Sequence, residues 1–244
     1  MEELATLLIE NEIDISTLEA VEDESGNLLL FLPVPGLEVI SYWERMRGLV
    51  EQTGYWPIII EELDSQLEMM EEYDYEPGTA SEIIAASQQI KAKEWLKNRF
   101  EHAGDGFEGF QYPRGIWPEK PMPKLGFLIA DDHETRYLAL LPTSQSWQGP
   151  AYLKFGNWGY CPAPEEHASV FKRWGEQYGA EIAWVEYDTL EARVLRPPRN
   201  QADAIRLAEE HYAYCPQVVY GGPGTIEGLA GELLDSPIWS FWWE

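Results

Sequence analysis

Basic residues are scarce in this chain and unevenly placed. Of its 244 residues, 17 are Lys or Arg against 43 Asp or Glu, which gives a formal net charge of −26 at pH 7. No Lys or Arg precedes Arg45, and none follows Arg206. A field of this sign repels DNA, RNA and anionic membranes. We therefore expect no nucleic-acid or membrane partner, and a basic protein is the partner class that the charge favours.

Cysteine and long apolar runs are also lacking. Two cysteines do not make a disulfide scaffold. No stretch approaches the roughly 18 apolar residues of a membrane span, and residues 1–10 have neither the basic start nor the apolar stretch of a secretory signal. We expect a cytoplasmic protein, and its 45% hydrophobic content predicts a large buried core.

Acidic residues concentrate between positions 61 and 76, where no Lys or Arg occurs. The acids are Glu61, Glu62, Asp64, Glu68, Glu71, Glu72, Asp74 and Glu76. One interpretation is a solvated face that keeps the protein soluble. The other is a docking surface for a basic protein, or a phosphate-like decoy for a nucleic-acid-binding one. The sequence leaves both open.

Tryptophan is frequent, with eleven residues, and the chain ends in an aromatic run over positions 238–244. A terminus of this composition must pack into a core or form a binding surface. Because side chains alternate along a strand, Trp239, Phe241 and Trp243 should point to one face and Trp242 to the other. We expect a closing strand here, and the covering of the Trp242 face is left open.

Local patterns predict mixed helix and strand in the first half. Hydrophobic spacing indicates helices at 3–10 and 39–50 and strands at 27–32 and 56–60. Thr79 followed by Glu82 is a capping-box pattern that predicts one long helix towards Arg99. The Gly- and Pro-rich segment 104–123 is a predicted linker or ordered loop.

The second half is more regular. We predict a hairpin of strands 125–130 and 137–141 around a polar tip, a strand at 151–155, and a hairpin of 182–186 with 190–195. His167 and Trp174 belong to a helical stripe that ends at Gly179. Asn200 and Thr225 are placed to cap two further helices.

Strands joined mostly by hairpins, with helices between them, favour an α+β fold over a doubly wound parallel sheet. We expect a mostly antiparallel sheet with helices packed on it, in two closely associated halves. The predicted halves are an N-terminal region at 1–115 and a C-terminal domain at 116–244.

A set of small, aromatic and turn residues recurs through the second half. Its members are Pro150, Ala151, Tyr152, Gly156, Trp158, Cys161, Pro162, Arg173, Trp174, Tyr178, Gly179, Ala180, Asp188, Thr189, Leu190, Glu191, Arg196, Pro197, Pro198, Tyr214, Cys215, Pro216, Gly222, Gly224, Thr225, Trp239, Phe241, Trp242 and Trp243. With this set, residues from about 140 to 244 resemble a bacterial domain-of-unknown-function family, the one numbered 4253. Gln217 and Glu244 depart from the family pattern, which has Asp at both places.

The first half is similar to the same family more loosely. The matching residues are Trp43, Arg47, Thr53, Gly54, Trp56 and Pro57. The resemblance implies a fold and a bacterial origin. It implies no catalytic residue, because the family has none assigned.

Both cysteines and two of the four histidines occur as pairs at short spacing, Cys161 with His167 and His211 with Cys215. Thiolates and imidazoles brought together in this way form tetrahedral zinc sites. The spacings match no standard zinc module, and a proline follows each cysteine, which favours a helix-boundary role. Packing of all four side chains in the core is the alternative. We expect no cofactor, with zinc as the one metal that these residues leave open.

Three other patterns are typical of functional sites, but each also has a simpler structural explanation. A thiol nucleophile at Cys161 or Cys215 requires a lowered pKa, which acidic surroundings oppose. The loop 221–225 opens a helix as phosphate-binding loops do, but no basic residue lies near it in the sequence. The acidic run 131–134 has a metal-binding composition, but its position between two strands predicts a solvated hairpin tip.

The remaining candidate is aromatic. Exposed tryptophan patches mark binding sites, and the residues proposed for a ligand or partner surface are Trp147, Tyr152, Trp158, Tyr160 and Trp242. The alternative is a sheet that is packed on both faces.

The leading hypothesis is a non-enzymatic binding or inhibitor protein, similar in role to bacterial immunity proteins, that docks a basic partner. The alternative is a metal-dependent or thiol enzyme that uses Cys161, His167, His211 and Cys215. A third possibility is a purely structural element of a larger assembly. The sequence does not determine the oligomeric state.

Overall fold

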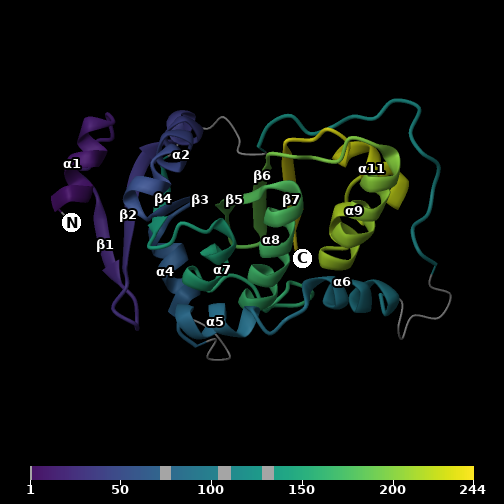
Figure 1. The fold of residues 1–244 in the computed structure, drawn as a ribbon, viewed down its shortest axis with the longest axis horizontal. Helices are drawn as coiled ribbons and strands as arrows, with labels where there is room; N and C mark the ends of the chain where they lie inside the picture. Colours follow the sequence, from purple (N-terminus) through teal and green to yellow (C-terminus); the bar gives the residue numbers. More distant parts are fainter. Residues whose placement is uncertain (1, 72–77, 104–110, 128–134) are drawn as a thin grey trace.

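The structure is a computed structural model that describes residues 2–71, 78–103, 111–127 and 135–244. In this part of the chain seven strands form one sheet. They are β1 (Glu19–Glu22), β2 (Leu28–Pro35), β3 (Trp56–Ile60), β4 (Thr135–Leu141), β5 (Ala180–Val185), β6 (Thr189–Val194) and β7 (Ile238–Trp242). Their order is β1-β2-β4-β3-β5-β6-β7 (Figure 1).

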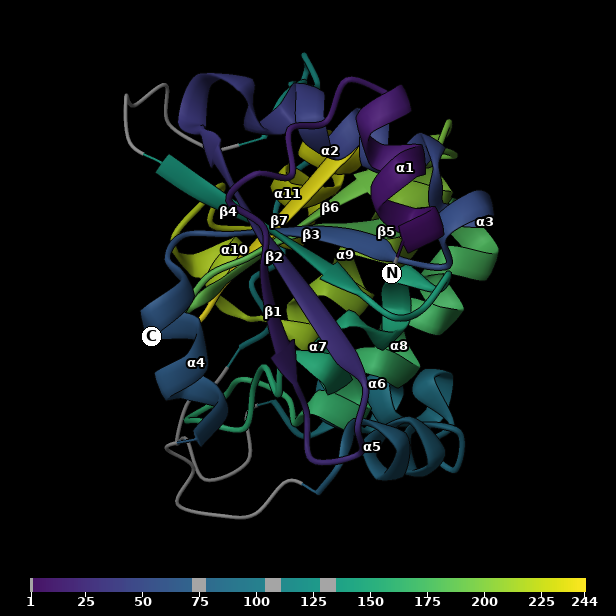
Figure 2. The ribbon, with the colours of Figure 1, turned by 90° about the vertical axis from the view of Figure 1, so that its left-hand side faces the viewer.

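The sheet is mixed, and mostly antiparallel. Only β3 and β5 run parallel, with Ile59 opposite Trp184, while every other neighbouring pair is antiparallel. With helices on this sheet, the predicted α+β class is confirmed (Figure 2).

Helices account for most of the remaining regular structure. They are α1 (Glu2–Glu10), α2 (Val39–Gly48), α3 (Val50–Thr53), α4 (Leu63–Glu71), α5 (Ala80–Ser87), α6 (Ala92–Glu101), α7 (Gly149–Tyr152), α8 (Pro164–Tyr178), α9 (Gln201–Tyr214), α10 (Gln217–Tyr220) and α11 (Ile226–Leu233), with 3-10 turns at Gly36–Glu38 and Ser146–Gln148. In the described residues no helix is long and apolar enough to cross a membrane.

Helices α2 and α8 lie on opposite faces of the sheet. On α2, Trp43 donates from Nε1 to the carbonyl of Pro57 in β3 and lies 5.8 Å from the Arg193 guanidinium in β6. The next residue along β6, Ala192, pairs with Trp239, whose ring packs 5.6 Å from Trp174 of α8. Because neighbouring residues of a strand point to opposite faces, these contacts place the two helices on different sides.

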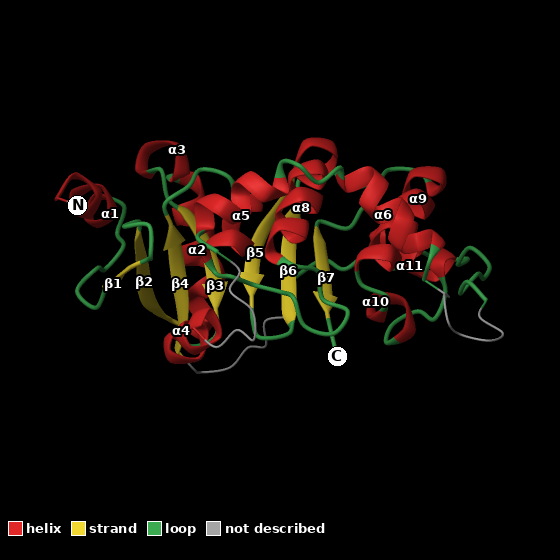
Figure 3. Ribbon diagram, turned by 90° about the horizontal axis from the view of Figure 1, so that it is seen from below, coloured by secondary structure: helices red, strands yellow, loops and turns green. Residues whose placement is uncertain are grey.

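Helices α9, α10 and α11 lie beyond β7, at the end of the sheet (Figures 1 and 3).

The predicted capping residues lie at the starts of α9 and α11. Asn200 accepts from the Asp203 amide at the start of α9, and Thr225 accepts from the Gly228 amide at the start of α11. Gly179 ends α8 in the left-handed conformation, as predicted.

The aromatic C-terminus forms the predicted closing strand. Trp239, Phe241 and Trp243 are each at most 1% exposed, and their rings pack against α8 and α9. Phe241 stacks on Trp174 with centroids 5.7 Å apart and meets Tyr214 edge-on at 4.8 Å. Trp242 points the other way and is half-buried.

The long helix predicted from Thr79 to Arg99 is wrong in its continuity. Thr79 and Glu82 form the predicted capping box, but α5 ends at Ser87 and α6 begins at Ala92. The carbonyl of Ile90, between them, accepts a hydrogen bond from Ser169 Oγ of α8 at 2.9 Å. A tertiary contact thus uses a carbonyl that a continuous helix would need for itself.

One predicted strand and one predicted hairpin pairing are also wrong. Residues 149–152 form α7 in place of a strand at 151–155, and a Cβ on Gly149 would lie 2.3 Å from Ile58 Cδ1, so this helix rests directly on the sheet. The strand 137–141 does belong to β4, but it pairs with β2 and β3, so the predicted hairpin with 125–130 is not its pairing. Positions 128–134, with the acidic run 131–134, lie outside the described residues.

The described part of the predicted linker, and the residues that follow it, form an ordered strap over α11. The Ile226 amide donates to the Pro113 carbonyl, the Gly115 amide donates to Glu227, and Ser236 Oγ donates to the Lys124 carbonyl. After this strap the chain enters β4, between β2 and β3. Both predicted halves therefore contribute strands to one sheet, and their division at residue 115 stays a prediction about folding units.

Because the closing strand is buried, truncating one of its aromatic side chains should lower the stability strongly. Replacing Phe241, which is fully buried, by Ala should lower the free energy of unfolding by about 3–5 kcal/mol, because it removes an aromatic side chain and leaves a cavity. Urea denaturation measures the change. Ile116→Ala, at a position that is 90% exposed, is the control and should change stability by less than about 0.5 kcal/mol. Equal effects would contradict the burial of the terminus.

Candidate functional site

The structure joins two of the four predicted cysteine and histidine ligands in a buried chain of polar groups. Cys161 Sγ lies 3.4 Å from His167 Nε2, and His167 Nδ1 lies 2.5 Å from the Tyr214 hydroxyl. Cys161 precedes α8, His167 lies in its first turns, and Tyr214 is the last residue of α9. Both ring nitrogens of His167 are engaged by protein groups.

The backbone of the loop before α8 also lies close against the His167 imidazole. Gly156 has φ of 116°, and a Cβ at this position would lie 2.1 Å from the Pro162 carbonyl and 2.7 Å from His167 Nε2. Only glycine combines this backbone conformation with this contact. The loop before α8 therefore shields the imidazole from solvent.

Burial keeps the chain of groups neutral. It raises the pKa of the Cys161 thiol far above its usual range and lowers the pKa of His167 to about 3, with the nearby Arg99 contributing to the second shift. Burial likewise raises the pKa of the Tyr214 hydroxyl. A neutral thiol beside a neutral imidazole lacks the thiolate that a cysteine nucleophile needs.

His211 and Cys215 have other partners. Cys215 Sγ donates to the Trp242 carbonyl at 2.9 Å. The ring of His211 lies among Trp174, Trp239 and Phe241, with centroids 4.7–4.9 Å away. Across the described ranges no group of three or more His, Cys, Asp or Glu side chains is placed to hold a metal ion. Within these ranges the structure does not bring Cys161, His167, His211 and Cys215 together around one point, and zinc binding by these residues stays a prediction.

The separation of these side chains has a physical reason. The sequence places His211 and Cys215 one turn apart on α9, but α9 directs His211 into the aromatic layer, while Cys215 ends the helix beside β7. Core packing, the alternative, accounts for His211, and both cysteines are buried and free.

The five aromatic residues proposed for a binding surface lie in different surroundings. Trp158 stacks on Tyr187 at 5.8 Å, Tyr160 is 49% exposed beside Arg99, and Trp147 lies 5.1 Å from Lys172 Nζ. Binding of a ligand by these three residues stays a prediction.

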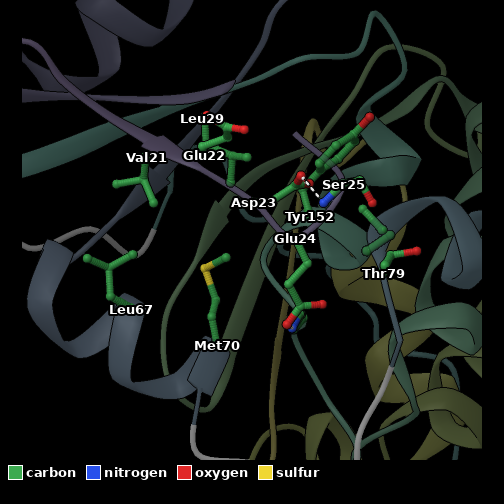
Figure 4. Close-up of a pocket in the computed structure, with 13 residues that line it drawn as sticks. Val21, Glu22, Asp23, Glu24, Ser25, Leu29, Leu67, Met70, Thr79 and Tyr152 are labelled. Carbon is green, nitrogen blue, oxygen red and sulfur yellow. Dashed lines mark hydrogen bonds and ion pairs between the residues drawn. The ribbon is translucent and has the colours of Figure 1, made fainter. Parts of the chain in front are cut away.

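Tyr152 lines a small cavity of about 140 Å³. Figure 4 shows it beside the turn that carries Asp23 and Ser25, with Leu67 and Met70 from α4 on the other side. The Tyr152 hydroxyl donates to the Pro142 carbonyl at 3.2 Å, so it is already satisfied within the protein. The walls of this cavity are mostly apolar. Trp242 lines a separate cavity at the edge of β7.

A charged cluster that the sequence analysis did not identify lies where the parallel strands β3 and β5 end. Glu61 follows β3 and Glu186 follows β5, while Arg136 lies at the start of β4, the neighbour of β3 on its other side. Arg136 Nη1 lies 3.1 Å from Glu61 Oε1 and 3.8 Å from Glu186 Oε1, and its side chain is 7% exposed. The sequence signal for this cluster is a charged residue directly after each of two buried strands.

Two adjacent hollows, of about 580 Å³ and about 510 Å³, open at this cluster and share Glu61 and Glu62. The carboxylates that line them are Glu19, Glu61, Glu62, Asp64, Glu68 and Glu186. We name this set the acidic hollows. Burial, with Glu61 close by, raises the pKa of Glu186 to about 7 even though Arg136 opposes the shift.

The buried thiols predict low reactivity. In the folded protein, iodoacetamide at about pH 8 should alkylate Cys161 and Cys215 at least about a hundredfold more slowly than in urea, because the pKa of Cys161 is strongly raised and that of Cys215 is raised to about 12. Mass spectrometry of the intact protein measures the rate. Rapid labelling of Cys161 in folded protein would contradict the neutral thiol and favour the thiol-enzyme alternative.

Glu186 predicts a pH dependence of stability. In the folded protein the Glu186 carboxyl keeps its proton up to about pH 7, whereas in the unfolded chain it loses the proton near pH 4.5. Ionisation of Glu186 therefore lowers the free energy of unfolding increasingly over that window. Glu186→Gln removes this cost and should gain stability relative to the wild type as pH rises from 4.5 to 7. Urea titrations at a series of pH values test this, with the exposed Glu176→Gln as control. A difference between Glu186→Gln and wild type that is constant with pH would refute the raised pKa.

Comparison with known proteins bears on the second half of the chain. Neither the curated proteins nor the solved structures contain a match. A family model does match, and its range begins in β4 and runs through β7 to the last residue. The resemblance in the second half is confirmed, because residues 137–244 match the model of a family described as a domain of unknown function, DUF4253.

Proposed function

We propose that this protein is a non-enzymatic binding protein that docks a basic protein partner, in the manner of an inhibitor or immunity protein. The observation that carries the proposal is the pair of acidic hollows, in which six carboxylates surround a single arginine among the lining residues. Lysine and arginine side chains of a partner match such a surface in charge.

The exposure of these acids supports the proposal. Glu61, Glu62, Asp64 and Glu68 are all exposed, and Arg136 is nearly buried between Glu61 and Glu186. The single arginine compensates only part of the charge, so the hollows stay strongly negative within a chain whose net charge is −26. Such a field steers a basic partner to the site and speeds its association.

The enzyme alternative has less support. The Cys161 and His167 pair is buried and neutral, and Cys161 is 6% exposed. A substrate at the Cys161 and His167 pair would therefore have no thiolate to react with. The exposed carboxylates of the acidic hollows are suited to recognition of positive charge, which needs no activated nucleophile.

We place the protein in the cytoplasm of a bacterium. Two free, buried cysteines suit a reducing compartment, and the bacterial origin rests on the resemblance in the second half.

Charge neutralisation tests the docking surface. The triple variant Glu62→Gln, Asp64→Asn and Glu68→Gln should bind the partner captured from the native host roughly tenfold more weakly, because each exposed charge contributes about 0.2–1 kcal/mol. Binding of the wild type should also weaken steeply as salt rises. Biolayer interferometry with the immobilised full-length protein measures both effects.

The matched control carries the same number of neutralised acids elsewhere. Glu38, Glu51 and Glu176 are exposed, and Glu51 precedes β3, at the opposite end of that strand from Glu61. The triple Gln variant at these positions should keep wild-type affinity. Equal loss in both triples, or binding that is insensitive to salt, would exclude docking at the acidic hollows.

A further inference from the structure

A second cavity, of about 210 Å³, lies at the outer edge of β7. Helices α9, α10 and α11 cover this edge (Figures 1 and 3). Lys124, from the strap over α11, is one of the residues that line the cavity. Trp242, Leu229 and Val218 contribute apolar wall. A cavity of about 150 Å³ is large enough to bind benzene, so this one has room for a small organic molecule.

Two buried ring nitrogens among its lining residues have no hydrogen-bond partner in the described chain. They are His211 Nε2 and Trp239 Nε1, in residues that are 2% and 1% exposed. An unsatisfied buried donor costs about 1–3 kcal/mol, and apolar side chains of similar size would avoid that cost. A ligand that accepts hydrogen bonds would offset it.

The edge of β7 adds backbone groups. Val194 donates to the Pro237 carbonyl and Trp243 to the Asp188 carbonyl, so odd-numbered residues of this strand exchange hydrogen bonds with the β6 side. By the alternation of an antiparallel ladder, Ile238, Ser240 and Trp242 turn their backbone groups to the open edge. The contacts of Ser236 Oγ with the Ile238 carbonyl and of Cys215 Sγ with the Trp242 carbonyl agree with this. Ser240, which lines the cavity, therefore presents its N–H and C=O on that side.

The cavity also holds one charge of each sign. Lys124 and Glu232 both line it, and no ion pair within 4 Å joins them in the described part of the chain. The Lys124 ammonium lies 5.8 Å over the Trp242 ring. Separate, opposite charges beside an apolar wall match a ligand that itself carries both charges. With a net charge of −26 on the protein, a neutral zwitterion avoids the repulsion that a free anion would meet.

We propose that this cavity binds a free α-amino acid with an apolar side chain. Lys124, the indole N–H of Trp239 and the backbone N–H of Ser240 receive its carboxylate, and Glu232 receives its ammonium. Leu229 and Val218 contact the side chain, and Trp242 forms the wall beside it. The site is separate from the acidic hollows, so it is independent of the proposed docking function.

The test uses the full-length protein and three related probes in isothermal titration calorimetry. L-Leucine should bind with a Kd below about 1 mM. The deaminated analogue 4-methylpentanoate and the decarboxylated analogue 3-methylbutylamine should each bind at least about tenfold more weakly, since each lacks one of the two charges. L-Phenylalanine in place of L-leucine tests the same class with a larger side chain. Failure of both amino acids to bind at about 10 mM, or equal binding of leucine and either analogue, would overturn the proposal.

Substitutions at the two charges locate the binding. Lys124→Gln and Glu232→Gln should each weaken leucine binding at least about tenfold. Lys120→Gln, at an exposed lysine of the same strap, is the matched control and should leave it unchanged. Circular dichroism and thermal melting of each variant without ligand establish that it is folded. Wild-type affinity in the folded Lys124→Gln protein would place the ligand elsewhere and overturn the site.

Discussion

The packing of β7 is the interaction on which the rest of this structure depends. Its odd-numbered residues contribute Trp239, Phe241 and Trp243 to an aromatic layer with α8 and α9, and its backbone pairs with β6. The same strand orders the loop before α8, because Trp243 packs 6.0 Å from Phe155 and 5.4 Å from His167. Its other edge forms one wall of the cavity that contains Lys124 and Glu232. A protein that lost this strand would lose core, buried polar chain and cavity together.

Desolvation explains which charged residues are available for function. Inside the aromatic layer it keeps Cys161, His167 and Tyr214 neutral, so residues that suggest catalysis in the sequence serve the core. At the ends of β3 and β5 the acids reach solvent, with Glu186 as the partly buried exception. This contrast between exposed acids and a neutral interior supports the proposed binding role.

Some of this arrangement follows from local sequence. Strand alternation is sufficient to assign Trp239 and Trp242 to different faces, and a side chain that accepts a backbone amide is sufficient to start helices at Asn200 and Thr225. Long-range contacts decide the rest. The break between α5 and α6 depends on Ser169, about eighty residues later, and the pairing of β4 with both β2 and β3 is not visible in the periodicity of any of them. The cluster of Glu61, Arg136 and Glu186 needs three strands in their final order, so residue spacing could not reveal it.

The proposed contact between the acidic hollows and a basic partner can be measured in the protein itself. Hydrogen–deuterium exchange of the full-length protein, free and in complex with the partner captured from its host, tests this claim directly. Docking at the acidic hollows predicts slower exchange on binding in the backbone of residues 61–68 and 186–187, which line them. Protection confined to other segments, with these two unchanged, would contradict it.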